Sequence, residues 1–197
     1  MTRTAAISRV TSETTIDLTL TLDGSGTADI ATGLGFFDHM LILLVGHSLI
    51  DLTLRCTGDL HVDGHHTVED VGRALGQGFR EALGDRSGIR RYGHTILPMD
   101  EALVTAAVDL GGRAACVLKA EYPVATIGSF DTQLVEVFWE GFAATAAANV
   151  HAILHHGHNA HHIAEAIFKG LARSIRMALE LDPRQKGIPS TKGSLTV

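Results

Sequence analysis

The chain has 197 residues, a length that suits one large domain or two small fused ones. Apolar residues make up 45% of it, which is enough for a sizeable core. Its formal net charge of −6 and its pI near 6.0 argue against a general nucleic-acid binder. The opening MTRTAAISRV has no apolar run behind a basic start, and the longest apolar run, residues 40–45, is too short to span a bilayer. We therefore expect a cytoplasmic protein without a secretory signal or membrane segment.

The first half alternates between strand and helix patterns. Apolar and polar residues alternate with period two in IDLTLTLDG and in DLTLRC, which is typical of strands. The predicted strands are 5–13, 16–23 and 51–56, and the predicted helices are 36–49 and about 66–83, the latter ended by Gly84. Residues 24–35 are rich in Gly, Ser and Thr and are predicted to be a connection. The helix 36–49 is apolar all round, which indicates that it is buried.

The second half repeats this order. The predicted strands are 93–97, 102–110, 114–120 and 149–154, and the predicted helices are 134–148 and about 162–181. Asp182-Pro183 ends the last helix, because the residue before proline is pushed out of helical space. The tail RQKGIPSTKGSLTV has no periodicity and is flexible unless it binds something. Cys56 and Cys116 lie in strand-like segments, so we expect buried free thiols rather than a disulfide.

Each half is therefore predicted to contain strands, a helix, a strand and a second helix, in that order. Long amphipathic helices bury their apolar face by covering a sheet. This predicts an α+β fold with an internal duplication. The pseudo-repeats are predicted at roughly 1–90 and 91–185, with the seam at 88–91 and a C-terminal tail at 186–197.

A motif H-H-x-x-E occurs at matching places in the two halves, with His65 and His161 lying 96 positions apart. Residues three or four apart share a helix face, so the carboxylate lies beside one histidine of its pair. Imidazole and carboxylate are ordinary ligands for manganese, zinc or iron. Adjacent histidines point about 100° apart on a helix, so each pair is predicted to serve two different metals. One copy alone is typical of solvated surface residues, but its repetition favours two metal sites.

Other residues are weaker candidates for metal or phosphate binding when each is considered alone. His39 lies on an otherwise apolar helix, where a lone histidine is more often a satisfied core residue than a ligand, and His47 shares its face two turns on. A few basic residues beside turns and Ser/Thr hydroxyls suit a phosphate, although each alone is typical of a solvated surface. They are Arg90, Arg91, Arg113, Lys169 and Lys192. The tail lacks the P-loop pattern.

Several segments together resemble one family closely and in order from about residue 9 to 195. They are RVTSETTIDLTLTLDG, GLGFFDHML, GDLHVDGHHTVEDVGRALGQ, GIRRYG, MDEAL, NAHHIAEAIFKGLAR and IPSTKG. The family is imidazoleglycerol-phosphate dehydratase of histidine biosynthesis. The resemblance implies internally duplicated half-domains, with two mixed β-sheets enclosing a four-helix bundle. It also implies a homo-oligomer of 24 subunits with active sites between subunits.

The resemblance further implies a reaction and a set of site residues. The reaction removes water from D-erythro-imidazole-glycerol phosphate to give imidazole acetol phosphate, with two manganese ions per active site binding the substrate imidazole. The implied metal ligands are His39, His65, His66, Glu69, His161, His162 and Glu165. The implied substrate and phosphate contacts are Glu13, His39, His47, Arg91, Arg113, Lys169, Ser190, Thr191 and Lys192. Glu13 is the candidate proton-transfer group, with His47 beside the substrate and Asp100 a weaker candidate.

The chain departs from the family pattern in two places. Many members carry a further histidine ligand where this chain has Val137, in LVEVFWEGF. Either Glu136 or a nearby histidine compensates, or one metal is held by fewer protein ligands. The second departure is His155, His156 and His158 in HAILHHGHN, which we expect in a solvated loop.

Two other classes of protein also accommodate the histidines. A non-catalytic metal storage or sensing protein explains the duplication, but not the seam arginines, Lys169 or the PSTKG tail. A structural oligomer that uses metal only to assemble predicts metal-dependent assembly with no affinity for imidazole phosphates.

Overall fold

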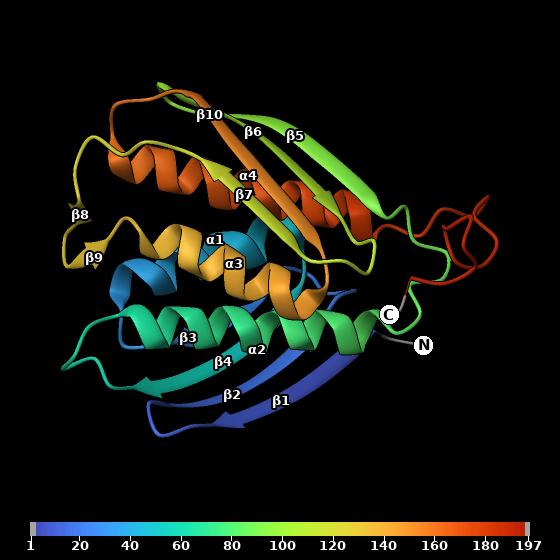
Figure 1. Cartoon of the computed structure of the whole chain (residues 1–197), viewed down its shortest axis with the longest axis horizontal. Coiled ribbons are helices and arrows are strands. Elements are labelled where there is room, and N and C mark those ends of the chain that lie inside the picture. Colours follow the sequence, from blue (N-terminus) through green and yellow to red (C-terminus); the bar gives the residue numbers. More distant parts are fainter. Residues whose placement is uncertain (1–2, 196–197) are drawn as a thin grey trace.

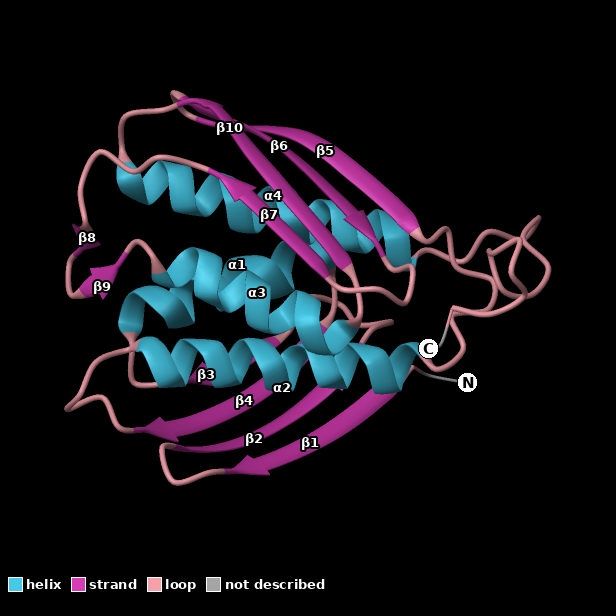
Figure 2. Ribbon diagram, viewed as in Figure 1, coloured by secondary structure: helices cyan, strands magenta, loops and turns pink. Residues whose placement is uncertain are grey.

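The computed structural model describes residues 3–195 as three layers, with four helices held between two four-stranded sheets (Figures 1 and 2). Both sheets are mixed, because each pairs one strand in parallel and the others antiparallel. The predicted α+β class, with two mixed sheets around four helices, is confirmed.

The first half supplies one sheet and two helices. Its sheet has the order β1-β2-β4-β3, formed by β1 (Thr4–Val10), β2 (Thr14–Thr21), β4 (Asp51–Gly58) and β3 (Ala28–Ala31). Helix α1 (Gly35–Ser48) precedes β4, and α2 (His65–Leu83) follows it and covers the inner face of this sheet.

The second half has the same layout. Its sheet has the order β5-β6-β10-β7, formed by β5 (Tyr92–Met99), β6 (Ala102–Asp109), β10 (Asn149–His156) and β7 (Ala115–Lys119). Helix α3 (Leu134–Ala146) precedes β10, and α4 (Ala160–Leu179) follows it and covers this sheet. In both sheets the short third strand pairs in parallel with the strand between the two helices. The two halves therefore share one topology.

Side-chain periodicity explains why these segments adopt these forms. Along β2, buried and exposed residues alternate, with Ile16, Leu18 and Leu20 turned to the helices. Helices α2 and α4 each bury one face against a sheet. Helix α1 is largely buried, as its apolar composition predicts, although Ile42 remains 46% exposed. Cys56 and Cys116 are free thiols, and burial raises the pKa of Cys56 to about 11.

Four details differ from the sequence expectations. Residues 24–35 are not only a connection, because they contain the strand β3. The first strand ends at Val10, where the Thr11 hydroxyl accepts the backbone N–H groups of Glu13 and Thr14 and turns the chain. A small hairpin, β8 (Thr126–Ile127) with β9 (Phe130–Asp131), precedes α3. Helix α4 ends at Leu179, and Leu181 forms an isolated bridge with Ile89.

No helix within residues 3–195 is long and apolar enough to cross a bilayer.

Helices α2 and α3 pack backbone against backbone at glycines. A Cβ on Gly76 would collide with the Phe142 carbonyl oxygen and the Thr145 hydroxyl, and a Cβ on Gly141 would lie 2.8 Å from the Glu69 carbonyl oxygen. Glycine at these positions therefore lets the helices approach closely.

We expect Gly76→Ala to lower the free energy of unfolding by roughly 1–3 kcal/mol, because the helices must separate to admit the methyl group. Gly46→Ala is the matched control, since Gly46 is also helical and a Cβ there meets nothing within 4 Å. That control should leave stability unchanged or raise it by up to about 1 kcal/mol. Urea unfolding of both variants at one protein concentration measures the difference, and equal stabilities would contradict the close approach.

Candidate active site

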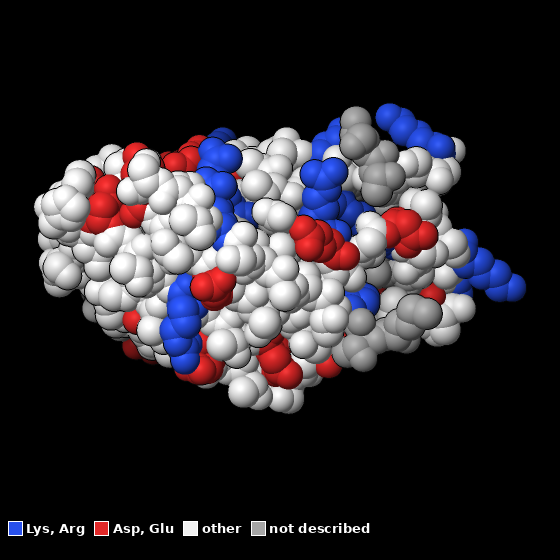
Figure 3. Space-filling view, turned by 90° about the horizontal axis from the view of Figure 1, so that it is seen from below, with Lys and Arg blue, Asp and Glu red and all other residues white. Residues whose placement is uncertain are grey.

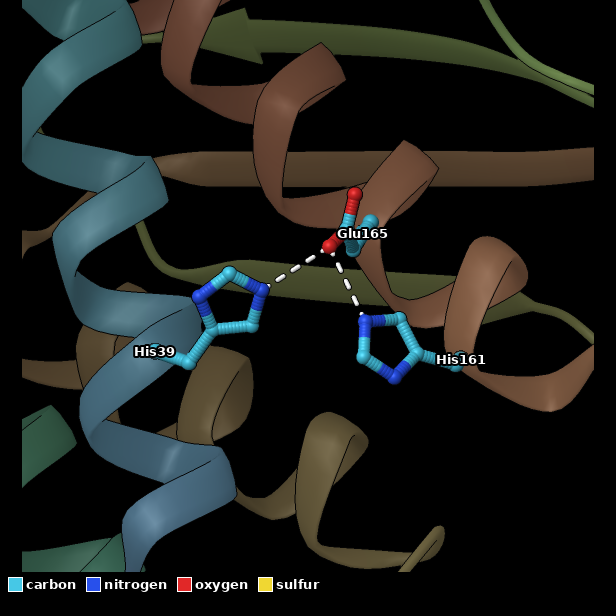
Figure 4. A group of neighbouring side chains, drawn as sticks. All are labelled: His39, His161 and Glu165. Carbon is cyan, nitrogen blue, oxygen red and sulfur yellow. Dashed lines mark hydrogen bonds and ion pairs between the residues drawn. The ribbon is translucent and has the colours of Figure 1, made fainter.

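Three side chains from two helices meet at the end of the bundle where α4 begins. His39 Nε2 of α1 lies 2.8 Å from Glu165 Oε1, and His161 Nε2 lies 3.0 Å from the same oxygen (Figure 4). His161 and Glu165 are one helical turn apart on α4, whereas His39 reaches them from the neighbouring helix. A residue distant in sequence thus joins the second H-H-x-x-E copy.

The start of α4 is held firmly. The Asn159 side chain caps the helix by accepting the backbone N–H of His161 at 3.0 Å. The Phe36 ring packs edge-on against the His161 ring, with centroids 5.2 Å apart. These contacts fix the direction of the His161 ring.

Glu165 is the buried centre of the group, 6% exposed. Its other carboxylate oxygen accepts a hydrogen bond from Lys169 Nζ at 2.5 Å. Burial opposes ionisation of Glu165, but hydrogen bonds from Lys169, His39 and His161 outweigh it and hold its pKa at about 2. Glu165 is therefore a carboxylate at neutral pH.

These three residues have the composition and spacing of a metal site. One ligand atom from each, two imidazole nitrogens and a carboxylate oxygen, lie within 4.8 Å of one another. Within residues 3–195, no other group of three or more His, Cys, Asp or Glu side chains converges in this way. Nitrogen and oxygen donors of this kind suit manganese, iron or zinc.

His162, the second histidine of this copy, points elsewhere. Its ring is inclined 82° to that of His161, and its Nδ1 lies 2.7 Å from Glu101 Oε2. Its Nε2 lies 3.7 Å from Asp100 Oδ2. The hydrogen bond to Glu101 raises the pKa of His162, and the same bond is the main cause that lowers the pKa of Glu101 to about 2.

The first copy repeats part of this arrangement. His66 Nδ1 lies 2.9 Å from Asp59 Oδ2, and His66 Nε2 lies 3.7 Å from Glu13 Oε1. The hydrogen bond to Asp59 raises the pKa of His66. His65 is exposed and makes no bond to Glu69, which is paired with Arg73 at 2.8 Å. Only the second copy gathers a third ligand candidate.

Val137 lies on α3 beside this first copy. Its neighbours along the helix contact α2, because Leu134 reaches Gly64 and Gly141 faces the backbone of Glu69. Val137 is half-buried and packs against the core. A valine thus occupies the side of α3 that faces the first copy, and a hydrocarbon side chain cannot ligate a metal.

The tail and the seam form a second candidate region. A cavity of about 900 Å³ is lined by five of the candidate phosphate contacts, namely Arg91, Arg113, Ser190, Thr191 and Lys192. Figure 3 shows basic side chains gathering toward the end of the molecule that carries the C-terminal tail. Arg113 and Lys192 are exposed there, and neither forms an ion pair with any other described residue.

Arg91 has a structural role in this region, because it links the tail to the second sheet. Its guanidinium donates to Asp109 at 2.7 and 3.0 Å and to the Pro189 carbonyl oxygen at 2.8 Å. The hydrogen bond to Asp109 raises the pKa of Arg91. Arg91 thereby fastens the tail to the edge of the second sheet, so Arg113 and Lys192 are the cations left available to an anion.

Two further candidates lie near the histidine cluster instead. Lys169 is bonded to Glu165, away from the tail cavity. His47 is half-buried, and burial, followed by the nearby charges of Lys169 and Arg173, lowers its pKa. A neutral His47 next to two cations can accept a hydrogen bond.

The extra histidines of the second half are not all in a loop. His155 and His156 are the last residues of β10, where the register shifts, and only His158 lies beyond it. His155 Nε2 is 2.7 Å from the Thr105 hydroxyl, and His156 Nδ1 is 2.8 Å from the Glu101 carbonyl oxygen. Both side chains are exposed, but the expectation of a loop was wrong for these two. Strand β10 continues to His156, which pairs with Leu103 of β6, and His155 lies at the register shift between them.

Asp59 and Glu101 are the site residues that sequence reasoning missed. Asp59 is one of several polar residues in GDLHVDG, and Glu101 stands next to the candidate Asp100. In the sequence, the only indication of a role was that each is acidic and lies near a candidate residue. Their bonds to His66 and His162 depend on the folded chain.

Comparisons with known proteins agree over nearly the whole chain. The family model described as imidazoleglycerol-phosphate dehydratase matches residues 32–175. A relative of that name from Rhodopirellula baltica is 58% identical over 98% of this chain and 96% of its own length. Another from Granulibacter bethesdensis is 56% identical over 99% of this chain and 100% of its own length.

Solved structures agree with the sequence relatives. The imidazoleglycerol-phosphate dehydratase of Staphylococcus aureus superposes with a TM-score of 0.83 at 34% identity, covering 91% of this chain and 99% of its own. The enzyme of Pyrococcus furiosus, in complex with (S)-C348, gives 0.82 at 33% identity, covering 96% of this chain and 100% of its own. The family model, the sequence relatives and the solved structures agree, and this chain belongs to the imidazoleglycerol-phosphate dehydratase family.

Proposed function

We propose that this chain catalyses the dehydration of D-erythro-imidazole-glycerol phosphate to imidazole acetol phosphate, a step of histidine biosynthesis in the cytoplasm. The observation that carries the proposal is the near-full-length identity to relatives of that name. The gathering of His39, His161 and Glu165 supports a metal-dependent reaction.

We propose that the active site holds two manganese ions. The proposed ligands are His39, His65, His66, Glu69, His161, His162 and Glu165. The observation that supports this proposal is the convergence of two imidazole nitrogens and one ionised carboxylate on a common point. When bound, manganese supplies Lewis-acid chemistry and a template for the substrate imidazole and hydroxyl.

Two exposed carboxylates are placed to handle protons. Glu13 Oε1 lies 3.7 Å from His66 Nε2, and Asp100 Oδ2 lies 3.7 Å from His162 Nε2. Each stands at the turn between the first two strands of its half. We assign proton transfer to Glu13 Oε1 as general acid and base, with Asp100 the weaker candidate and His47 contacting the substrate.

We expect Glu13→Gln to retain its manganese and its assembly but to lose most turnover, by roughly 10²–10⁴-fold, because the amide cannot exchange a proton. Asp17→Asn is a matched control, since Asp17 is an exposed carboxylate in the adjoining β2 strand. Steady-state kinetics and elemental analysis of both variants provide the measurement. Full activity in Glu13→Gln would remove the assigned role.

The phosphate end of the substrate is proposed to bind Arg113, Lys192, Ser190 and Thr191, with Arg91 holding the tail in place. This cavity borders the C-terminal end of α4, where Arg91 donates its backbone N–H to the Ala178 carbonyl oxygen at 3.0 Å. From Glu165 to that point α4 rises about 20 Å, at about 1.5 Å per residue. The five bonds from imidazole to phosphorus reach at most about 8 Å, at about 1.5 Å each.

This separation along α4 supports an active site that takes its two regions from different subunits. We propose that the tail cavity of one subunit meets the histidine cluster of another, in an assembly of 24 copies with active sites between subunits. Lys169 lies within the histidine cluster, and we propose that it contacts the phosphate from that side.

Turnover by purified, manganese-loaded protein tests the proposal, with imidazole acetol phosphate followed in the presence and absence of a chelator. Chelator-sensitive product formation is the expected result. If the protein binds metal but forms no product, the dehydratase assignment fails and metal storage or sensing takes its place.

A further inference from the structure

The second histidine of each H-H pair turns the same ring nitrogen to a carboxylate of its own chain. His66 Nδ1 lies 2.9 Å from Asp59, and His162 Nδ1 lies 2.7 Å from Glu101. In both rings the other nitrogen, Nε2, faces a second carboxylate at 3.7 Å, which is too long for a hydrogen bond. One nitrogen is engaged and the other remains open.

The two carboxylates come from different parts of the fold. Asp59 follows β4, only seven positions before His66. Glu101 belongs to the turn between β5 and β6, 61 positions before His162. The same contact is thus built twice from non-equivalent segments, which argues against a chance pairing in either half.

The two carboxylates are restrained in different ways. Glu101 Oε1 accepts the backbone N–H groups of His158 at 3.2 Å and Asn159 at 2.8 Å. The Asp59 side chain is 18% exposed, and its backbone N–H donates to the Glu13 carbonyl oxygen at 3.1 Å. Glu101 is therefore fixed by hydrogen bonds, whereas the Asp59 carboxylate is restrained by burial, with its Oδ1 buried and without a hydrogen-bond partner.

A rigid acceptor on Nδ1 decides the chemistry of the ring. A carboxylate accepts, so Nδ1 must carry the hydrogen, and a neutral imidazole has only one N–H. The lone pair available to a metal then lies on Nε2. An imidazole whose other nitrogen donates to a carboxylate is also a better oriented and more basic ligand.

We propose that Asp59 and Glu101 are positioning residues that fix the tautomer and orientation of His66 and His162, so that both present Nε2 to a metal. This inference rests on the proposed metal sites and deepens them. His161 makes a different contact, since its Nε2 bonds Glu165, one turn later on the same helix. The two histidines of a pair thus have different partners for different sites.

Solid-state ¹⁵N NMR of the full-length metal-free protein, labelled at histidine, tests the tautomers, because ring-nitrogen shifts distinguish N–H from a lone pair. Calorimetry with manganese tests their consequence. We expect Asp59→Asn to alter the ring signals of His66 only and to weaken manganese binding by about 10–100-fold. Glu101→Gln should do the same to His162. Signals are assigned from His66→Gln and His162→Gln.

Asp63→Asn is the matched control in the same loop, because its carboxylate accepts the backbone N–H of His65 at 2.8 Å and contacts no ring. It should change neither the tautomers nor the affinity. Unchanged ring signals in Asp59→Asn and Glu101→Gln, or altered signals with unchanged affinity, would overturn the inference. If wild-type protein binds no manganese at all, the proposed metal sites fail, whereas the tautomer assignment is still decided by the spectra.

Discussion

Replacing Glu165 by glutamine is expected to abolish metal binding at the cluster and to lower turnover by more than about 100-fold. Glu165 Oε1 hydrogen-bonds both His39 and His161, and the ionised carboxylate is the only negative charge within the three-residue group. An amide leaves the two imidazoles without a charged partner and leaves Lys169 unpaired beside them. Loss of a residue that merely orients a ligand costs about 10–100-fold, so loss of a ligand is expected to cost more.

Glu140→Gln is the control, since Glu140 is an exposed carboxylate on the neighbouring α3 helix. Elemental analysis and kcat should be unchanged in this variant. Circular dichroism of both proteins checks that Glu165→Gln remains folded. A folded Glu165→Gln protein with a full metal complement would mean that the cluster is not a metal site.

Introducing a histidine at position 137 is expected to give the first half a third metal ligand, which is the role proposed for His39 in the second half. Helix α1 lies beside α4 and supplies His39 to Glu165, whereas α3 lies beside α2 and offers Val137 to the turn that holds Glu69. Glu165 and Glu69 are alike in that each is paired with a cation four residues later. They differ in that His161 bonds Glu165 whereas His65 makes no bond to Glu69, and in that position 137 offers the first copy no ligand.

Val137→His should therefore raise the manganese content and tighten the weaker binding event by at least about tenfold, equivalent to about 1.4 kcal/mol. Glu136→His is the matched control, since it places a histidine about 100° around the same helix. Glu136→Gln tests whether that carboxylate already serves as the missing ligand, in which case its metal content falls. If Val137→His gains no metal, another residue already completes the first site.

Much of the fold follows from local pattern. The alternation in IDLTLTLDG and DLTLRC is sufficient to place β2 and β4, because only a strand turns alternate side chains to one face. The apolar stripes of α2 and α4 are long enough to identify helices. The strand β3 is different, because its four residues are too few to show a period and it becomes a strand by pairing with β4.

The sequence by itself determined the class of fold, the family and which residue types carry the chemistry, because periodicity and motif order are properties of short segments read along the chain. Only the tertiary structure decided which of those residues meet. His39 lies 126 positions from Glu165, and their contact exists because α1 packs beside α4. The bond between His162 and Glu101 likewise spans 61 positions. Such contacts are set by the packing of whole helices and sheets, which no local pattern records.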